Sequence, residues 1–183
     1  QLYSVHPFGN TLITLALSGD QLRRVLEQQW ESPQPQSGNV LSVSAGFSYR
    51  WDISQPGGAV SGQGRRIVPG SMRLHGVAID PGQVYRVTVN SFLASGGDNF
   101  SVFTEGRKLA ESEKDIDVLM AYFRAQGVVK VPGAAGRSRT VPAASWPITG
   151  WVTVPRTRGT LNICFLASSW PLAMAAGTSR DLP

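Results

Sequence analysis

Two short segments place an aromatic side chain beside residues that can hydrogen-bond a ligand. PFGN contains Phe8 and Asn10, and NSFLASGGDNF contains Phe92 and Asp98. An exposed phenylalanine offers a flat π face to a planar ring, and such stacking contributes about 1–3 kcal/mol per base in nucleic-acid complexes. An aspartate can accept hydrogen bonds from two vicinal hydroxyls. The two segments are therefore candidates for binding a planar ring that carries a hydroxylated group.

The glycines of the second segment allow two interpretations. Gly96 and Gly97 have no side chain, so the backbone there can approach a ligand closely and present its amide groups. The same residue types also form ordinary turns, and the spacing fits a turn at Gly96–Asp98 with both phenylalanines in the core. The residues by themselves leave both interpretations open.

Residues for metal binding or nucleophilic catalysis are sparse. The two histidines, His6 and His75, stand in no His-x-x-x-His, Asp-x-His or Asn-His-Glu arrangement, so the spacing of a binuclear metal centre is absent from the sequence. The single cysteine, Cys164, lies in the apolar stretch ICFLA, where a buried and inert thiol is expected. The sequence therefore predicts neither a metal ligand nor a catalytic residue.

A glycine-rich basic segment, SGQGRRIVPG, resembles a phosphate-binding loop only in composition. It lacks the Gly-Lys-Ser/Thr ending of such a loop, and no Gly-x-Ser-x-Gly nucleophile motif occurs elsewhere. We expect a flexible hairpin loop at this segment.

Charge and composition exclude two classes of partner. The net charge is +5, but residues 1–127 hold 11 basic and 11 acidic residues, so the whole excess belongs to residues 128–183. A nucleic-acid surface needs its cations clustered on a folded face, and a bilayer crossing needs roughly 18–20 apolar residues in one run. We therefore expect no nucleic-acid partner and no membrane span. The start, QLYSVHPFG, lacks a signal pattern, as in a mature or internal piece.

Hydrophobic periodicity predicts an α+β fold with a mixed sheet and a few packed helices. Alternating patterns indicate strands at TLITLALS and VYRVTVN, and VLSVS and GFSYRWD are shorter strand candidates. SMRLHGVAI follows the glycine-rich segment and precedes the turn before VYRVTVN. A helix is expected at SGDQLRRVLEQQW, capped by Ser18 or Asp20, and a second at DIDVLMAYFRAQG, with Gly127 as its C-terminal cap. The apolar face of the first consists of Leu22, Val25, Leu26 and Trp30, and that of the second of Ile116, Leu119, Met120 and Phe123. Strands and helices alternate irregularly, which argues against a doubly wound parallel sheet.

The composition changes after Gly136. Residues 137–183 contain three of the five tryptophans, many Pro, Ala and Arg residues and almost no acid. The pieces WVTV and LNICFLA fit a late hairpin, whereas the composition as a whole also fits a poorly ordered extension.

Four motifs in order resemble the C-terminal domain of the 5'-nucleotidase family, which includes the bacterial UDP-sugar hydrolases and the animal ecto-5'-nucleotidases. The motifs are PFGNTLITLALSGDQLRRVLEQQ, LSVSAGFSYRWD, YRVTVNSFLASGGDNFSVF and DIDVLMAYFRAQG. The resemblance spans residues 1–136. It implies the α+β fold of that C-terminal domain, truncated at its N-terminus and followed by an atypical basic tail over residues 137–183.

The resemblance implies binding roles for five residues. Phe8 and Phe92 would hold a nucleobase between their rings, and Asn10 would contact the edge of the base. Asp98 would accept hydrogen bonds from the ribose hydroxyls, and the backbone near Gly46 in VSAGF would line the same pocket.

In that family an N-terminal metallophosphoesterase domain holds two metal ions and hydrolyses the nucleotide, while the C-terminal domain grips the nucleoside. The resemblance thus implies that this chain has no cofactor of its own, serves nucleotide catabolism through a missing N-terminal partner domain, and is inactive alone. It also implies an extracytoplasmic location, meaning secreted, periplasmic or cell-surface. Two alternatives stay open, namely a stand-alone module that binds nucleosides or other planar ligands, and a structural or interaction domain whose phenylalanine pair is buried.

Overall fold

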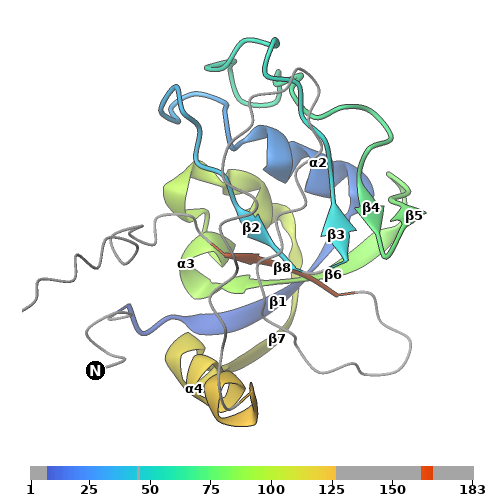
Figure 1. Cartoon of the computed structure of the whole chain (residues 1–183). Coiled ribbons are helices and arrows are strands. Elements are labelled where there is room, and N and C mark those ends of the chain that lie inside the picture. Colours follow the sequence, from blue (N-terminus) through green and yellow to red (C-terminus); the bar gives the residue numbers. More distant parts are fainter. Residues whose placement is uncertain (1–7, 45, 127–161, 167–183) are drawn as a thin grey trace, which may run out of the picture.

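The computed structural model describes residues 8–44 and 46–126 and the backbone of residues 162–166 (Figure 1). Its centre is a mixed five-stranded sheet in the order β2-β8-β6-β1-β7. β6 and β8 are parallel, and the other neighbours are antiparallel. The predicted α+β class with a mixed sheet is confirmed. The strands are β1 (Thr11–Ser18), β2 (Ser42–Val43), β6 (Val84–Asn90), β7 (Arg107–Lys114) and β8 (Asn162–Leu166).

β1 and β6 form the middle of the sheet and carry its apolar face. Their register pairs Leu12 with Asn90 and Ser18 with Val84. Alternate side chains point to one face because successive residues of a strand face opposite sides. On that face lie Ile13, Leu15, Leu17, Tyr85, Val87 and Val89, which are all buried.

The helix α2 (Gly19–Glu27) packs on this apolar face and begins at the predicted cap. The Ser18 hydroxyl accepts a hydrogen bond from the backbone N–H of Gln21, and the Gln21 side chain accepts one from the backbone N–H of Ser18. This reciprocal capping box fixes the start of the helix. The predicted apolar face is confirmed, since Leu22, Val25, Leu26 and Trp30 are all buried.

The predicted strand VLSVS supplies the short β2 of the main sheet. SMRLHGVAI is divided into two short strands, which form a second sheet with one from GFSYRWD. The second sheet contains β3 (Phe47–Ser48), β4 (Arg73–Leu74) and β5 (Val77–Ala78) in that order. A fully buried Gln29 joins this part to the end of α2, because its side-chain oxygen accepts hydrogen bonds from the Tyr49 hydroxyl at 3.1 Å and from the Leu41 amide at 2.9 Å. Burial raises the pKa of Tyr49 to about 12, so the phenol stays a donor across the physiological range.

The glycine-rich segment is a structural loop held by two buried carboxylates. Glu27 accepts hydrogen bonds from the backbone N–H groups of Arg66 and Ile67, and Glu31 accepts them from Gly62 and Gly64. Amide groups that would face an anion in a phosphate loop are therefore occupied by side chains of this chain. A Cβ on Gly64 would lie 2.8 Å from a carboxylate oxygen of each glutamate, so glycine is required there for close approach.

The segment after β6 is more ordered than the sequence pattern indicated. It forms a short helix, two 3₁₀ turns, the edge strand β7 and a final helix, and Figure 1 shows that helix beside β7. These elements are α3 (Ser91–Ala94), η1 (Gly97–Asn99), η2 (Ser101–Glu105) and α4 (Asp115–Gln126). β7 was not predicted, because RKLAESEK has no apolar alternation and is almost wholly exposed. The helix α4 was predicted, but its face is only partly covered, since Ile116 is buried while Phe123 is 38% exposed.

Part of the atypical tail contributes to the sheet. Within the LNICFLA piece, Asn162–Leu166 form β8, which lies between β6 and β2 and pairs Thr88 with Cys164 and Val43 with Phe165. Its partners are therefore strands of the main sheet. The WVTV piece, the Gly127 cap and the domain boundary expected at Gly136 lie outside the described residues. Within the described part of the chain, no helix has the length and apolar character needed to cross a membrane.

Candidate functional site

The antiparallel pairing of β1 and β6 brings the two aromatic segments to one end of the sheet. PFGN precedes β1, and the SFLASGGDNF segment follows β6 directly. Because Leu12 is paired with Asn90, the chain enters β1 at the level where it leaves β6. The loops that carry Phe8 and Phe92 are thus neighbours although more than eighty residues separate them in sequence.

Hydrogen bonds fasten these two loops together. The Ser91 hydroxyl donates to the side-chain oxygen of Asn10 at 3.3 Å and accepts from the backbone N–H of Thr11 at 3.2 Å. The Asn90 side chain accepts from the Leu93 amide at 2.8 Å and so caps α3. The start of α4 is tied to the same place, because the Asp115 amide donates to the Asn10 carbonyl at 2.8 Å. Asn10 is therefore a junction of three chain segments.

Both candidate stacking residues are at the surface. Phe8 is 62% exposed and Phe92 is 44% exposed, whereas Phe100, further along the same segment, is fully buried. Both rings therefore present part of their surface to solvent, where a ligand could contact them. The alternative that both phenylalanines are core residues is wrong, and so is the idea of a buried phenylalanine pair.

The Phe92 ring lies against the backbone of Gly97. A Cβ placed on Gly97 would be 2.6 Å from Cε1 and Cζ of the ring, far inside van der Waals contact. The glycine predicted to approach a ligand thus contacts the aromatic side chain instead. The absence of a side chain at Gly97 leaves room for the ring, which is 44% exposed.

The backbone between Gly96 and Asn99 adopts left-handed angles three times. The φ values are +86° at Gly96, +52° at Asp98 and +63° at Asn99. Glycine, aspartate and asparagine are the residue types that tolerate this region, which costs other residues roughly 1–2 kcal/mol each. The sequence GGDN is therefore compatible with a tightly folded loop rather than a simple turn.

Asp98 presents an unpaired carboxylate oxygen in this loop. Its Oδ2 atom is shielded from solvent and has no hydrogen-bond partner among the described residues, although the residue as a whole is half-buried. Since a shielded carboxylate oxygen without donors is costly, a hydroxyl or amide donor from a ligand would stabilise it. The backbone carbonyl of Asp98, by contrast, accepts a short hydrogen bond from the Gln34 side chain at 2.6 Å.

The structure does not tie Gly46 to the other candidates. Gly46 has a φ of +92°, and a Cβ there would lie 2.5 Å from the imidazole ring of His75. The Gly46 carbonyl accepts a hydrogen bond from the His75 amide at 2.6 Å. The contacts described for Gly46 therefore belong to the end of the paired strands β3 and β4, while hydrogen bonds and packing join Asn10 to Ser91 and Phe92 to Gly97.

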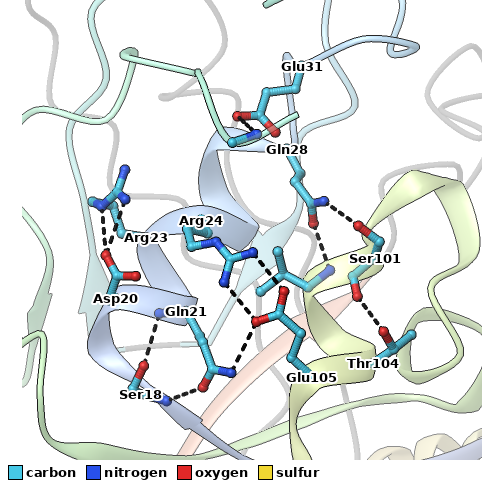
Figure 2. Close-up of polar contacts among 12 residues, drawn as sticks. Ser18, Asp20, Gln21, Arg23, Arg24, Gln28, Glu31, Ser101, Thr104 and Glu105 are labelled. Atoms are coloured by element: carbon cyan, nitrogen blue, oxygen red, sulfur yellow. Dashed lines mark hydrogen bonds and ion pairs between the residues drawn. The ribbon is translucent and has the colours of Figure 1, made fainter. Parts of the chain in front are cut away.

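Side chains of α2 and of Gln28, the residue after it, hold η2, which follows the Gly96–Asn99 loop (Figure 2). Gln28, which is buried, donates to the Ser101 hydroxyl at 2.8 Å and accepts from the Val102 amide at 3.2 Å. Arg24 donates two hydrogen bonds of 2.7 Å to the Glu105 carboxylate, and the Arg24 guanidinium holds the pKa of Glu105 below its ordinary value. The end of the loop is therefore anchored to the core helix.

Sequence reasoning missed the polar residues that support the site. Gln28 and Gln34 belong to no motif, because QQWESPQPQ has the pattern of a helix end followed by a linker. Their position after an amphipathic helix can be seen in the sequence, but it does not indicate which distant residue each glutamine binds. Only the fold brings Gln34 next to Asp98, which lies 64 residues away in sequence.

The described residues contain no group of three or more His, Cys, Asp or Glu side chains that could hold a metal ion. The groups gathered at the sheet end are aromatic rings, one carboxylate and amide groups. Such a set suits recognition of an uncharged planar ligand with hydroxyls.

Comparison with known proteins places this chain in a defined group. The family model described as "5'-nucleotidase, C-terminal domain" matches residues 1–105. An apyrase from Tabanus yao is 31% identical over 151 residues, which cover 77% of this chain and 26% of that protein. The trifunctional nucleotide phosphoesterase protein YfkN of Bacillus subtilis is 35% identical over 106 residues, covering 57% of this chain and 7% of that protein.

A solved structure shares the fold. The 5'-nucleotidase precursor from Thermus thermophilus is 28% identical, with a TM-score of 0.50, and the match covers 72% of this chain and 25% of the other. The chain therefore spans about a quarter or less of the length of these relatives.

Proposed function

This chain belongs to the 5'-nucleotidase family, as its C-terminal domain, and on that basis we propose that it recognises the nucleoside part of a nucleotide. The family resemblance predicted from the four motifs is confirmed. The role in recognition is our proposal, and the arrangement of the sheet end supports it.

The observation that carries the proposal is the hydrogen-bonded pairing of two loops that each expose a phenylalanine. The Asn10–Ser91 contact holds the loops together, and Phe8 and Phe92 flank it in sequence. We propose that the two rings stack on opposite faces of a nucleobase, since each stacked base contributes about 1–3 kcal/mol. Asn10 would contact the edge of the base.

Asp98 would bind the sugar. Its unpaired Oδ2 lies in the loop that carries Phe92, and a carboxylate can accept from both vicinal hydroxyls of a ribose. By family resemblance, the backbone near Gly46 would line the same pocket.

Hydrolysis would be performed by another part of a longer protein. The relatives are about four times as long as the region they share with this chain. An N-terminal metallophosphoesterase domain with two divalent metal ions would supply a metal-bound nucleophile and neutralise charge on the phosphoryl group. This chain would position the nucleotide, which is a major source of rate enhancement. By family resemblance, the location would be extracytoplasmic.

Calorimetric titration of the full chain with adenosine tests the proposal. The wild type is expected to bind adenosine, and Phe92→Ala is expected to weaken binding by about 1–3 kcal/mol through the lost stacking contact. Val84→Ala serves as a control, because Val84 is 63% exposed at the opposite end of β6. Equal binding by all three proteins, or none by the wild type, would contradict the proposal.

A further inference from the structure

We propose that Gln34 is a positioning residue for Asp98, so that it governs recognition of the sugar hydroxyls without touching the ligand. This inference rests on the proposed nucleoside function and extends it to a residue outside the two aromatic loops. It is carried by the hydrogen bond between the Gln34 side chain and the Asp98 backbone.

The first step is the contact itself. The Gln34 Nε2 atom donates to the Asp98 carbonyl at 2.6 Å, across 64 residues of sequence, in a half-buried place. Asp98 has left-handed backbone angles, φ 52° and ψ 30°, inside a 3₁₀ turn. Aspartate tolerates that region better than most residues, and a hydrogen bond that fixes its carbonyl group supports this conformation further. The Gln34 amide supplies such support by fixing the direction of the carbonyl group.

The second step is what the Asp98 backbone controls. The direction of the carboxylate depends on the angles of its own Cα, and its Oδ2 has no hydrogen-bond donor among the residues described. The backbone angles, together with the side-chain torsions, therefore set where the carboxylate points. Loss of the Gln34 contact would let the carboxylate turn away from the sugar position.

The third step is that the backbone of Gln34 is itself fixed by the fold. The backbone N–H of Gln34 donates to the Glu31 carbonyl at 2.9 Å and closes a turn after α2. Glu31 is 4% exposed, and its carboxylate accepts the Gly62 and Gly64 amides at 3.0 and 2.9 Å. Gly38, further along the segment, packs against the Trp30 ring, where a Cβ would lie at 2.4 Å. The glycine-rich loop thus supports Gln34, and Gln34 supports the binding loop.

Among the described residues, the other hydrogen bonds of the loop at this point join near neighbours. The Phe100 amide donates to the Gly97 carbonyl at 3.2 Å, and the Gly96 amide donates to the Leu93 carbonyl at 2.9 Å. Gln28 acts further on, at Ser101 and Val102. Gln34 is the long-range contact on which the conformation of Asp98 depends within the described part of the chain.

The experiment compares Gln34→Met with Gln36→Met in the full chain. Methionine has a similar length but no donor, and Gln36 is an exposed glutamine of the same segment. Each protein is titrated with adenosine and with 2',3'-dideoxyadenosine, which has the same base but no vicinal hydroxyls. Amide hydrogen exchange of Phe100 is measured without ligand, because it reports the order of the loop.

We expect Gln34→Met to weaken adenosine binding about five-fold, as for one lost hydrogen bond, and to leave dideoxyadenosine binding unchanged. The Phe100 amide should exchange faster in this variant, and Gln36→Met should match the wild type throughout. Equal weakening for both ligands would indicate general damage to the loop and overturn the positioning role. Unchanged adenosine binding or unchanged exchange would also overturn it.

The proposed function fails separately. If the wild type binds neither nucleoside, nucleoside recognition is wrong, and the role of Gln34 in hydroxyl recognition is overturned with it. If the wild type binds adenosine and Gln34→Met binds it as tightly, the function stands and the role of Gln34 alone is overturned.

Discussion

The Phe92 ring covers the backbone of Gly97, so the glycine of the binding loop sets the direction of the aromatic side chain. The contact joins two residues that the sequence motif SFLASGGD keeps five positions apart. It gives the second glycine of the motif a physical reason, which is the absence of a Cβ beneath the ring.

Gly97→Ala is expected to weaken nucleoside binding and to change stability little. The new Cβ would meet the ring at 2.6 Å, and the 44%-exposed ring can rotate outward at small cost. The loss of binding free energy should be about 1–3 kcal/mol, the contribution of one stacked base. Calorimetry with adenosine measures it, and thermal unfolding checks the fold.

Gly82→Ala is the matched control for this change. Gly82 is exposed, and a Cβ there would have one neighbour within 4 Å, Asp80 Oδ1 at 3.6 Å. If Gly97→Ala bound adenosine as tightly as Gly82→Ala, the role assigned to Gly97 would be incorrect.

Phe92 and Phe100 should separate binding from stability. Phe100 is fully buried and packs against Phe103 with ring centroids 6.2 Å apart, so Phe100→Ala should lower the free energy of unfolding by about 3–5 kcal/mol. Phe92→Ala removes an exposed ring and should leave unfolding nearly unchanged. Urea denaturation followed by fluorescence compares the two variants with the wild type. A large loss of stability in Phe92→Ala would mean that its ring belongs to the core.

Local patterns in the sequence were sufficient for the main elements. The alternation in TLITLALS and VYRVTVN predicted β1 and β6, and Ser18 predicted the start of α2. These patterns work because the residues that bury a strand or cap a helix lie close together in sequence. The order of the motifs was also enough to identify the family.

The elements and contacts that the sequence did not predict depend on interactions between distant segments. β7 forms because β1 offers an edge, and its own residues carry no apolar alternation. Gln34 and Gln28 bind backbone groups more than sixty residues away. Nothing in a glutamine's local sequence reports such a partner, because side-chain to backbone hydrogen bonds are set by the tertiary fold.

Glu27→Gln should loosen the glycine-rich loop. The two oxygens of Glu27 each accept a backbone amide, from Ile67 at 3.0 Å and from Arg66 at 2.9 Å. A glutamine has one acceptor, so its amide group would face a donor, and the cost should be about 1–3 kcal/mol of stability. Urea denaturation measures this cost, and limited proteolysis should show new cleavage between residues 57 and 70.

Glu113→Gln is the control for Glu27→Gln, since Glu113 is an exposed glutamate on β7. Glu113→Gln should be cleaved by the protease, and should unfold in urea, like the wild type. Identical proteolysis of both variants would show that the Glu27 hydrogen bonds do not hold the loop.

The Arg24–Glu105 pair should add a small acid-sensitive term to stability. Arg24 lowers the pKa of Glu105 below the ordinary 4.5, so the folded state favours the ionised carboxylate. A carboxyl whose pKa is lower in the folded than in the unfolded state stabilises the fold above the unfolded value, and this stabilisation is lost as the pH falls through the folded pKa. Both side chains are more than a third exposed, so we expect about 0–1 kcal/mol, reduced further by salt.

Glu105→Gln isolates this term. At neutral pH the variant should unfold slightly more easily than the wild type, and the difference should vanish as the pH is lowered well below 4.5, where the Glu105 carboxyl is protonated in both states. Chemical denaturation at low salt, repeated from neutral to acid pH, measures the difference. A gap between the two proteins that stays constant down to the most acid point would show that the change acts through packing of η2 on α2 rather than through the charge of Glu105.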